Sequence, residues 1–210
     1  MKNSPLFFIA LFGALALSFG AVVLVSLRQL GQLDAYFDAG EGAAFPARAP
    51  GLAARGLLVY RDLGCAACHT QQVRRPGFGT DQERGWGERQ SVARDYIFQS
   101  RVQLGQTRIG PDLTNFGERA AKAGTDQAKL YLDLYAGRGG MPAYPFLFEA
   151  RRIVGQPAKQ VLPVKSRPGY EVVPTRRAEA LAAYLLSLKA DFTYPEAQPL
   201  EPATASGNKP

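Results

Sequence analysis

An apolar stretch at the N-terminus stands apart from a longer region of mixed polarity. Residues 3–27 carry no charged side chain and are mostly apolar, and a helix of this length can cross the hydrocarbon core of a bilayer. A cleaved signal peptide is the alternative, with Ala14-Leu15-Ala16 as a cleavage signature. The apolar run continues past that point, whereas the apolar part of a signal peptide is shorter. We therefore predict a retained transmembrane helix over residues 1–30.

Charges on either side of this helix indicate its orientation. Lys2 precedes it, whereas Arg28 is soon followed by Asp34, Asp38 and Glu41. Positive charge favours the cytoplasmic side of a membrane. We expect a single span in the bacterial inner membrane, with the lipid bilayer as one partner and the rest of the chain in the periplasm.

Two helical patterns frame the region after the anchor. Residues 31–50 are rich in Ala, Gly and acidic residues and are interpreted as a connector. Residues 51–63 place apolar positions three and four residues apart, which predicts a helix with one buried stripe. Residues 175–189 show the same pattern, with Thr175 as the cap. The predicted buried stripe of the first helix consists of Leu52, Gly56, Val59, Tyr60 and Leu63.

The remaining segments are less regular. Short helices are expected over residues 91–100 and 125–136, the latter capped by Asp126. Residues 146–174 contain several prolines and are interpreted as an irregular insertion. The proline-rich residues 193–210 are expected to form a flexible tail. The chain is therefore predicted to be mostly α-helical, and its folded domain is predicted to span residues 51–192.

The chemistry is concentrated in Cys65-Ala66-Ala67-Cys68-His69. Two thiols three residues apart, followed at once by a histidine, are typical of a c-type haem attachment site. In such a site, Cys65 and Cys68 form thioether bonds to the haem and His69 ligates the iron. The chain has no other cysteine or histidine. It can therefore hold only one histidine-ligated haem c.

Two other uses of these thiols are weaker. A disulfide between Cys65 and Cys68 is permitted in an exported protein, but such short bridges are usually redox-active and accompany a thioredoxin-like βαβ pattern, which is missing. Structural zinc sites need four ligands. Cys65, Cys68 and His69 supply three, and the sequence has no second cluster of cysteine or histidine.

A second axial ligand is expected from a methionine. The chain contains only Met1 and Met141, and Met1 begins the apolar stretch. Met141 lies in a loop punctuated by glycine and proline, which suits an isolated iron ligand, and His/Met ligation raises the haem potential. A core methionine that fills a gap is the alternative, as is an iron with an open distal position or another ligand.

A backbone carbonyl is expected to orient the His69 ring. Ligand histidines usually donate their other ring N–H to an acceptor. The Pro111 carbonyl is a candidate because the preceding Gly110 lets the backbone come close to the ring. From spacing alone, a plain turn explains this segment equally well.

The chain is basic, with a net charge of +7 and a pI near 9.6. No nucleic-acid-binding motif accompanies this charge, so no nucleic-acid partner is expected. We expect most of the arginines in the middle of the chain to be solvated, and the others to pair with haem propionates, a neighbouring subunit or an acidic redox partner. These arginines are Arg74, Arg75, Arg84, Arg89, Arg94, Arg101 and Arg108.

The order of these features resembles a class I cytochrome c, in which the first and last helices cross near a glycine and an aromatic residue. Gly56, Tyr60 and Tyr184 match those positions. Three longer segments resemble the mono-haem subunit II (FixO/CcoO family) of cbb3-type cytochrome c oxidases. They are Cys68-His69-Thr70-Gln71-Gln72-Val73-Arg74, Arg108-Ile109-Gly110-Pro111-Asp112-Leu113 and Met141-Pro142-Ala143-Tyr144-Pro145-Phe146.

This resemblance implies a membrane-anchored, one-electron relay without a catalytic site of its own. Its partners would be a haem–copper catalytic subunit and a di-haem cytochrome c subunit. A free-standing tethered cytochrome that shuttles between complexes is an alternative with the same chemistry. A haem-based sensor is a different class, because it requires an open iron position.

Overall fold

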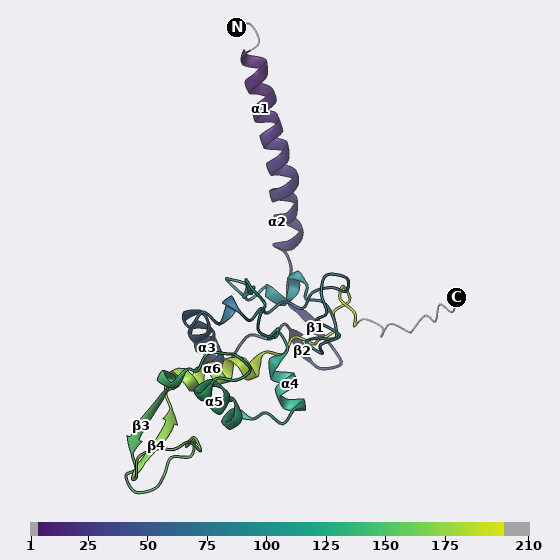
Figure 1. The fold of residues 1–210 in the computed structure, drawn as a ribbon. Coiled ribbons are helices and arrows are strands. Elements are labelled where there is room, and N and C mark those ends of the chain that lie inside the picture. Colours follow the sequence, from purple (N-terminus) through teal and green to yellow (C-terminus); the bar gives the residue numbers. More distant parts are fainter. Residues whose placement is uncertain (1–3, 200–210) are drawn as a thin grey trace, which may run out of the picture.

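The computed structural model describes residues 4–199 (Figure 1). Its N-terminal helix consists of α1 (Ser4–Ser18), a π-helical segment (Phe19–Leu24) and α2 (Val25–Leu30). These 27 residues project from the remaining chain and are long and apolar enough to cross a membrane. The helix therefore has the dimensions predicted for an anchor.

Helices α3 (Gly51–Asp62) and α6 (Arg176–Ser187) pack against each other at the centre of the domain. Gly56 makes this crossing close. A β-carbon on it would lie 1.9 Å from the Ala180 carbonyl oxygen and 2.5 Å from Tyr184 Cβ. Both helices are confirmed, as is the cap by the Thr175 side chain. The predicted stripe of α3 is wrong at Leu52, which is 48% exposed, whereas its neighbour Ala53 is fully buried.

Two shorter helices complete the core. α5 (Gln127–Ala136) is confirmed, with the Asp126 carboxylate accepting a hydrogen bond of 2.8 Å from the Lys129 N–H. α4 (Phe116–Lys122), which packs on α6, was not predicted. The helix expected over residues 91–100 is reduced to a 3₁₀ turn, Ala93–Tyr96. The Asp95 carboxylate accepts from the Val92 N–H at 2.8 Å and pairs with Arg89 at 2.7 Å, which holds the segment in this single turn.

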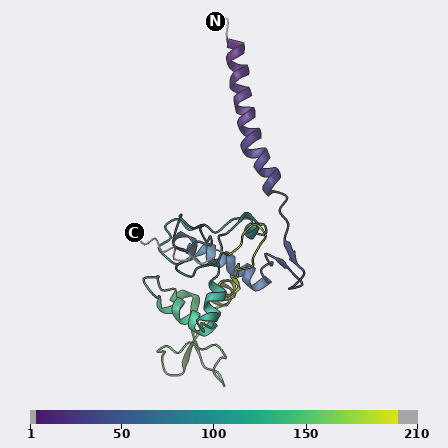
Figure 2. The ribbon, with the colours of Figure 1, turned by 90° about the vertical axis from the view of Figure 1, so that its right-hand side faces the viewer.

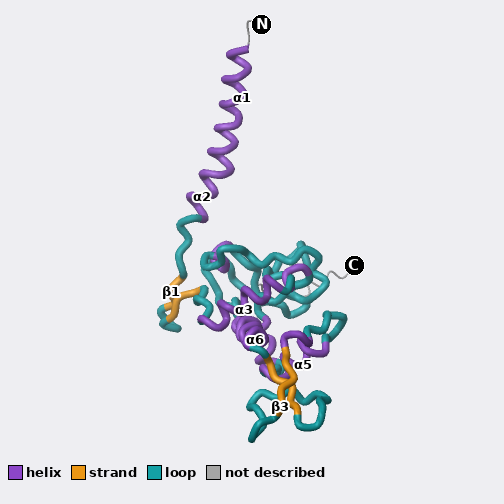
Figure 3. Tube along the Cα trace, turned by 90° about the vertical axis from the view of Figure 1, so that its left-hand side faces the viewer, coloured by secondary structure: helices purple, strands orange, loops and turns teal. Residues whose placement is uncertain are grey.

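Strands occur in two small antiparallel hairpins among the described residues (Figure 3). β1 (Tyr36–Asp38) pairs with β2 (Ala43–Phe45) inside the predicted connector. β3 (Phe148–Arg152) pairs with β4 (Tyr170–Pro174). The interpretation of residues 146–174 as wholly irregular was therefore wrong. The two ends of that segment pair with each other, and the prolines lie in the loop between the strands or at the end of β4.

The segment after α6 returns to the hairpin that follows the anchor (Figure 2). Phe192 stacks on Phe45, with ring centroids 3.9 Å apart, and contacts Tyr36 at 5.8 Å. Within residues 193–199, Tyr194 and Ala197 are buried. This part of the predicted tail is therefore packed rather than flexible, because the Tyr194 ring buries apolar surface. The rest of the predicted tail lies outside the described residues.

A buried arginine fastens this return segment. Arg89 is 3% exposed and donates two hydrogen bonds to the Asp95 carboxylate, at 2.7 and 2.9 Å. It also donates to the carbonyls of Ala190 and Phe192, at 2.7 and 2.6 Å. The return segment and the β1–β2 hairpin together form what we call the clasp, defined as residues 36–45 and 190–199.

Candidate haem site

The two cysteines lie immediately after α3. Gly64 ends that helix in the left-handed conformation, with φ of 70°, which is accessible to glycine without steric cost. A 3₁₀ turn over Cys65–Ala67 follows, and the His69 N–H donates to the Cys65 carbonyl at 2.9 Å. Both thiols are half-buried and free. The sequence therefore presents two thiols and one imidazole from a single turn.

The His69 ring is held by the Gly110–Pro111 backbone. The distance from His69 Nδ1 to the Pro111 carbonyl oxygen is 2.9 Å. Since a carbonyl can only accept, Nδ1 carries the proton and donates, which leaves the Nε2 lone pair available to a metal. A β-carbon on Gly110 would lie 2.3 Å from Cε1 of the same ring. Only glycine fits there without moving the imidazole.

The loop that carries Pro111 is attached to the segment that carries His69. The Gly110 N–H donates to the Cys68 carbonyl at 3.0 Å, and the Leu113 N–H donates to the Thr70 carbonyl at 2.9 Å. Two backbone hydrogen bonds therefore flank the His69–Pro111 contact on either side. This pairing joins residues that lie about 40 positions apart in the chain.

Asp112 reinforces the same junction. Its fully buried carboxylate accepts from the Gln72 N–H at 3.0 Å and from the Thr114 N–H at 2.7 Å. Burial raises the pKa of Asp112, although the hydrogen bonds from Thr114 and Gln72 act in the opposite direction. Asp112 thus links the loop to the backbone three residues after His69.

Two tyrosines from the crossing helices hold the backbone that follows the imidazole. Tyr60 on α3 donates to the His69 carbonyl at 2.9 Å, and Tyr184 on α6 donates to the Gln71 side-chain oxygen at 2.8 Å. Their rings meet edge to face at 5.4 Å. Burial is the main cause that raises the pKa of both, to about 12 for Tyr184. Sequence reasoning placed these rings at the helix crossing but missed the hydrogen bonds.

Met141 lies in the loop after α5. The Tyr144 N–H donates to the Leu134 carbonyl of α5 at 2.8 Å, which folds the loop back onto the helix. Met141, Tyr144 and Cys65 are all partly buried against the same hydrophobic core. The pKa of Tyr144 is raised by burial and then by the charges of Cys65 and Cys68. Tyr144, three residues after Met141, therefore lies near the cysteine motif.

Several of the arginines expected to be solvated or to meet an outside partner instead form internal ion pairs. Asp81 is fully buried and accepts from Arg74 and Arg108, each at 2.7 Å. Burial acts to raise the pKa of Asp81, but these arginines outweigh it and the pKa is lowered. The expectation for Arg74, Arg108 and the buried Arg89 was therefore wrong, because a tertiary partner cannot be read from local sequence.

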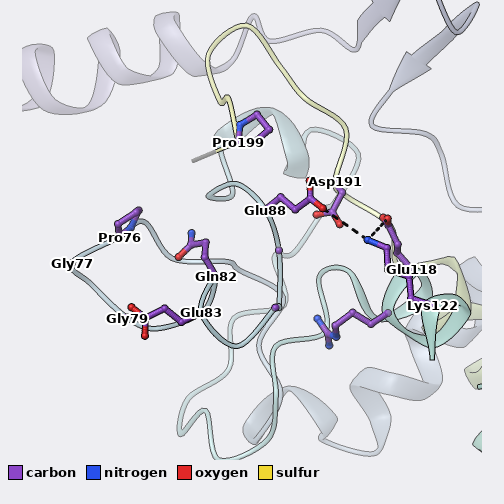
Figure 4. A pocket seen from close by; sticks show the side chains of 13 residues that line it. Pro76, Gly77, Gly79, Gln82, Glu83, Glu88, Glu118, Lys122, Asp191 and Pro199 are labelled. Atoms are coloured by element: carbon purple, nitrogen blue, oxygen red, sulfur yellow. Dashed lines mark ion pairs between the residues drawn. The ribbon is translucent and has the colours of Figure 1, made fainter. Parts of the chain in front are cut away.

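A separate cavity of about 810 Å³ lies among α4, the loop of residues 76–88 and the return segment (Figure 4). Its lining is acidic. Lys122 pairs with Glu118 at 3.0 Å and with Glu88 at 3.9 Å. Burial and the neighbouring Glu118 and Glu88 carboxylates raise the pKa of Asp191 to about 6. None of the predicted site residues lines this cavity.

Neither rival use of the thiols gains support from the structure. Burial raises the pKa of Cys65 to about 11, whereas redox-active Cys-x-x-Cys thiols have lowered pKa values. Among residues 4–199, no three cysteine, histidine or acidic side chains are grouped so that they could bind a bare metal ion. A zinc site built on Cys65, Cys68 and His69 is not supported.

The residues present fit a haem. The Nε2 atom of His69 is available, both thiols are free, and Met141 packs against the same hydrophobic core as Cys65. Ile109, which precedes Gly110, is 82% exposed, and Leu104, which precedes the Gly105 that lies against Thr70, is 51% exposed. Apolar surface of this kind is what a porphyrin covers. Haem ligation by these residues stays a prediction.

Two helices that cross at a glycine, with a Cys-x-x-Cys-His motif between them, define a cytochrome-type electron-transfer domain. Residues 43–189, well over half of the chain, match the family described as "Cytochrome C oxidase, mono-heme subunit/FixO". The chain belongs to this family, as its motifs indicated. It is therefore a mono-haem subunit of a cytochrome c oxidase, with haem as its cofactor. A search of curated proteins found no match.

Proposed function

We propose that this chain is a membrane-anchored c-type cytochrome that relays single electrons to the catalytic subunit of a cbb3-type haem–copper oxidase. One observation carries the proposal. In a member of this family, the imidazole that follows Cys-x-x-Cys donates its Nδ1 proton to the Pro111 carbonyl and leaves Nε2 free. That is the arrangement required of a proximal haem ligand.

The roles of the site residues follow from their contacts. Cys65 and Cys68 would hold the haem through thioether bonds, and His69 and Met141 would be the axial ligands. When bound, the haem supplies a site that can gain and lose one electron. The Pro111 carbonyl orients the imidazole and increases the basicity of Nε2. Substrate binding at iron is not needed for a relay with two protein ligands.

The surrounding residues make the site rigid. Tyr60 and Tyr184 hold the backbone after His69, and Asp112 holds the loop that carries Pro111. A ligand fixed in this way needs little rearrangement when the charge on iron changes. The low dielectric of the buried surroundings, together with the axial ligands, sets the potential.

The N-terminal helix supports a tethered relay. A single apolar helix of 27 residues precedes the domain, and the clasp fastens the domain to the segment that leaves this helix. A tether of this kind raises the effective concentration of a redox group near its acceptor. We place the domain in the periplasm and expect the catalytic subunit and a di-haem cytochrome c subunit as its neighbours.

Two measurements test this proposal. The denatured polypeptide, made in cells that mature c-type cytochromes, should carry the mass of one haem, and Cys65→Ser with Cys68→Ser should remove it. Extraction of membranes in mild detergent should then yield this chain together with a histidine-rich, many-helix subunit. An apoprotein mass would refute the attachment, and a cytochrome that purifies alone would refute the oxidase assignment.

A further inference from the structure

The β3–β4 hairpin grows directly out of the methionine loop. A 3₁₀ turn over Pro145–Leu147 joins Met141's loop to β3. Phe148, the first residue of β3, contacts the rings of Tyr131 and Tyr135 on α5, at 5.9 and 5.4 Å between centroids. The base of the hairpin is therefore fixed to the core beside the proposed axial ligand.

The far end of the hairpin is strongly basic. Residues 150–170 contain five lysines and arginines and no acidic residue. Arg151 is neutralised by Glu171, whose buried carboxylate accepts at 2.8 Å. The other four are exposed, and none forms an ion pair within the part of the chain that the structure describes. We call them the basic tip: Arg152, Lys159, Lys165 and Arg167.

Apolar side chains accompany these charges on the same loop. Val154 is 86% exposed, and Val161 and Tyr170 are each 38% exposed. The loop itself is held in place, since Leu162 is buried and its N–H donates to the Val172 carbonyl at 2.8 Å. Exposed apolar groups with a charged rim, presented on a fixed loop, are typical of a protein-binding surface.

The position of the basic tip restricts what can reach it. The hairpin projects at the end of the molecule opposite to the N-terminal helix (Figures 1 and 3). A molecule that binds there approaches from the aqueous side rather than from within the bilayer. The positive charge favours a molecule that presents an acidic surface.

We propose that the basic tip docks a small acidic redox protein from the aqueous side. This inference rests on the proposed function, because it gives the electron donor a place to bind on the hairpin that follows the methionine loop. Four unpaired cations would steer such a partner and orient it. The segment from Met141 to Phe148 connects that site to the base of the hairpin.

The experiment uses the full chain in nanodiscs of zwitterionic lipid and plastocyanin, a small acidic copper protein, as the probe. In the tip variant, Arg152, Lys159, Lys165 and Arg167 are all replaced by Gln. In the control variant, four exposed cations elsewhere lose the same charge, namely Arg55, Arg101, Lys129 and Lys189, again replaced by Gln. Association is followed by interferometry at low and high ionic strength.

The tip variant should associate at least about tenfold more slowly than the natural chain at low ionic strength, and the control variant less than about threefold more slowly. The difference should vanish at about 1 M salt, where charges are screened over about 3 Å. Equal loss in both variants, or no loss in either, would overturn the docking proposal. Docking at the basic tip does not require haem. The intact mass of the same samples shows whether haem is attached, and so tests the proposed function separately.

Discussion

The imidazole of His69 lies directly against the backbone of Gly110. A β-carbon at Gly110 would lie 2.3 Å from Cε1 and 2.5 Å from Nδ1 of that ring. Both distances are far shorter than a van der Waals contact. The same residue pair is flanked by the backbone hydrogen bond from Gly110 to Cys68, so neither partner can move away freely.

We therefore expect Gly110→Ala to displace the ring and break the contact between His69 Nδ1 and Pro111. The free energy of unfolding should fall by about 1–3 kcal/mol, as for other overpacked sites, and the yield of covalently loaded protein should fall with it. Thermal unfolding and intact mass measure the two effects. Gly51→Ala is the matched control, because nothing lies within 4 Å of that position. Equal stability of the two variants would contradict the contact.

Gly56→Ala tests the crossing of α3 and α6. The added methyl group would lie 1.9 Å from the Ala180 carbonyl oxygen, which is backbone and cannot turn aside. The helices must separate, and we expect a loss of about 3 kcal/mol or more. Denaturant unfolding measures this, again beside Gly51→Ala in the same helix. A loss below 1 kcal/mol would show that the crossing adapts.

Met141→Leu tests the second axial ligand. Leucine keeps the apolar volume but has no sulfur, so haem should stay attached while the iron gains an open position. The potential should fall on the order of 0.1 V, within the roughly 0.8 V that axial ligands span. Redox titration and carbon monoxide binding to the reduced protein measure these changes. If the variant has the same spectrum and potential as the natural chain, Met141 is not an iron ligand.

Asp191 makes the stability depend on pH. Its pKa is about 6 in the folded chain, raised by burial and by the neighbouring Glu118 and Glu88, against about 3.9 when unfolded. The folded state therefore binds more protons than the unfolded state between about pH 4 and 6, and stability falls as pH rises through this window. At pH 7 the free energy of unfolding is therefore lowered by about 1 kcal/mol, once solvent screening of this partly exposed group is allowed for.

Asp191→Asn should remove this dependence and stabilise the protein at pH 7, as measured by thermal unfolding at a series of pH values. Asp126→Asn serves as the control. Asp126 caps α5 at the surface by accepting a hydrogen bond from the Lys129 N–H. Asn can accept the same hydrogen bond, so the control removes a carboxylate without removing the cap. An Asp191→Asn curve parallel to that of the natural chain would show that Asp191 does not titrate in this range.

Replacement of Phe192 should separate the two parts of the clasp. Phe192→Ala removes the stacking on Phe45 at 3.9 Å and the contact with Tyr36. We expect the β1–β2 hairpin to open and cleavage by trypsin at Arg48 to become several times faster, with little change in the unfolding of α3 and α6. Phe78→Ala, at a ring that is 62% exposed, is the control. Unchanged cleavage at Arg48 would argue against the clasp.

The sequence by itself determined the features whose physics is local. Cys65, Cys68 and His69 are adjacent in the chain, so their chemistry does not depend on folding. Helices α3, α5 and α6 follow from apolar spacing and from capping by Asp126 and Thr175, which act within one turn. For Pro111 the spacing left two interpretations open, an acceptor for His69 or a plain turn, and the structure shows the contact with His69.

The long-range hydrogen bonds and the pairing of β3 with β4 were decided by the tertiary structure alone, because they join residues that no local pattern connects. The Arg89 side chain donates to carbonyls about a hundred residues away, and Tyr184 donates to Gln71 at a similar separation. Strands β3 and β4 pair across a loop that contains no apolar alternation. A polar group finds its partner only after the core has brought distant segments together, since burial leaves it no water to bond.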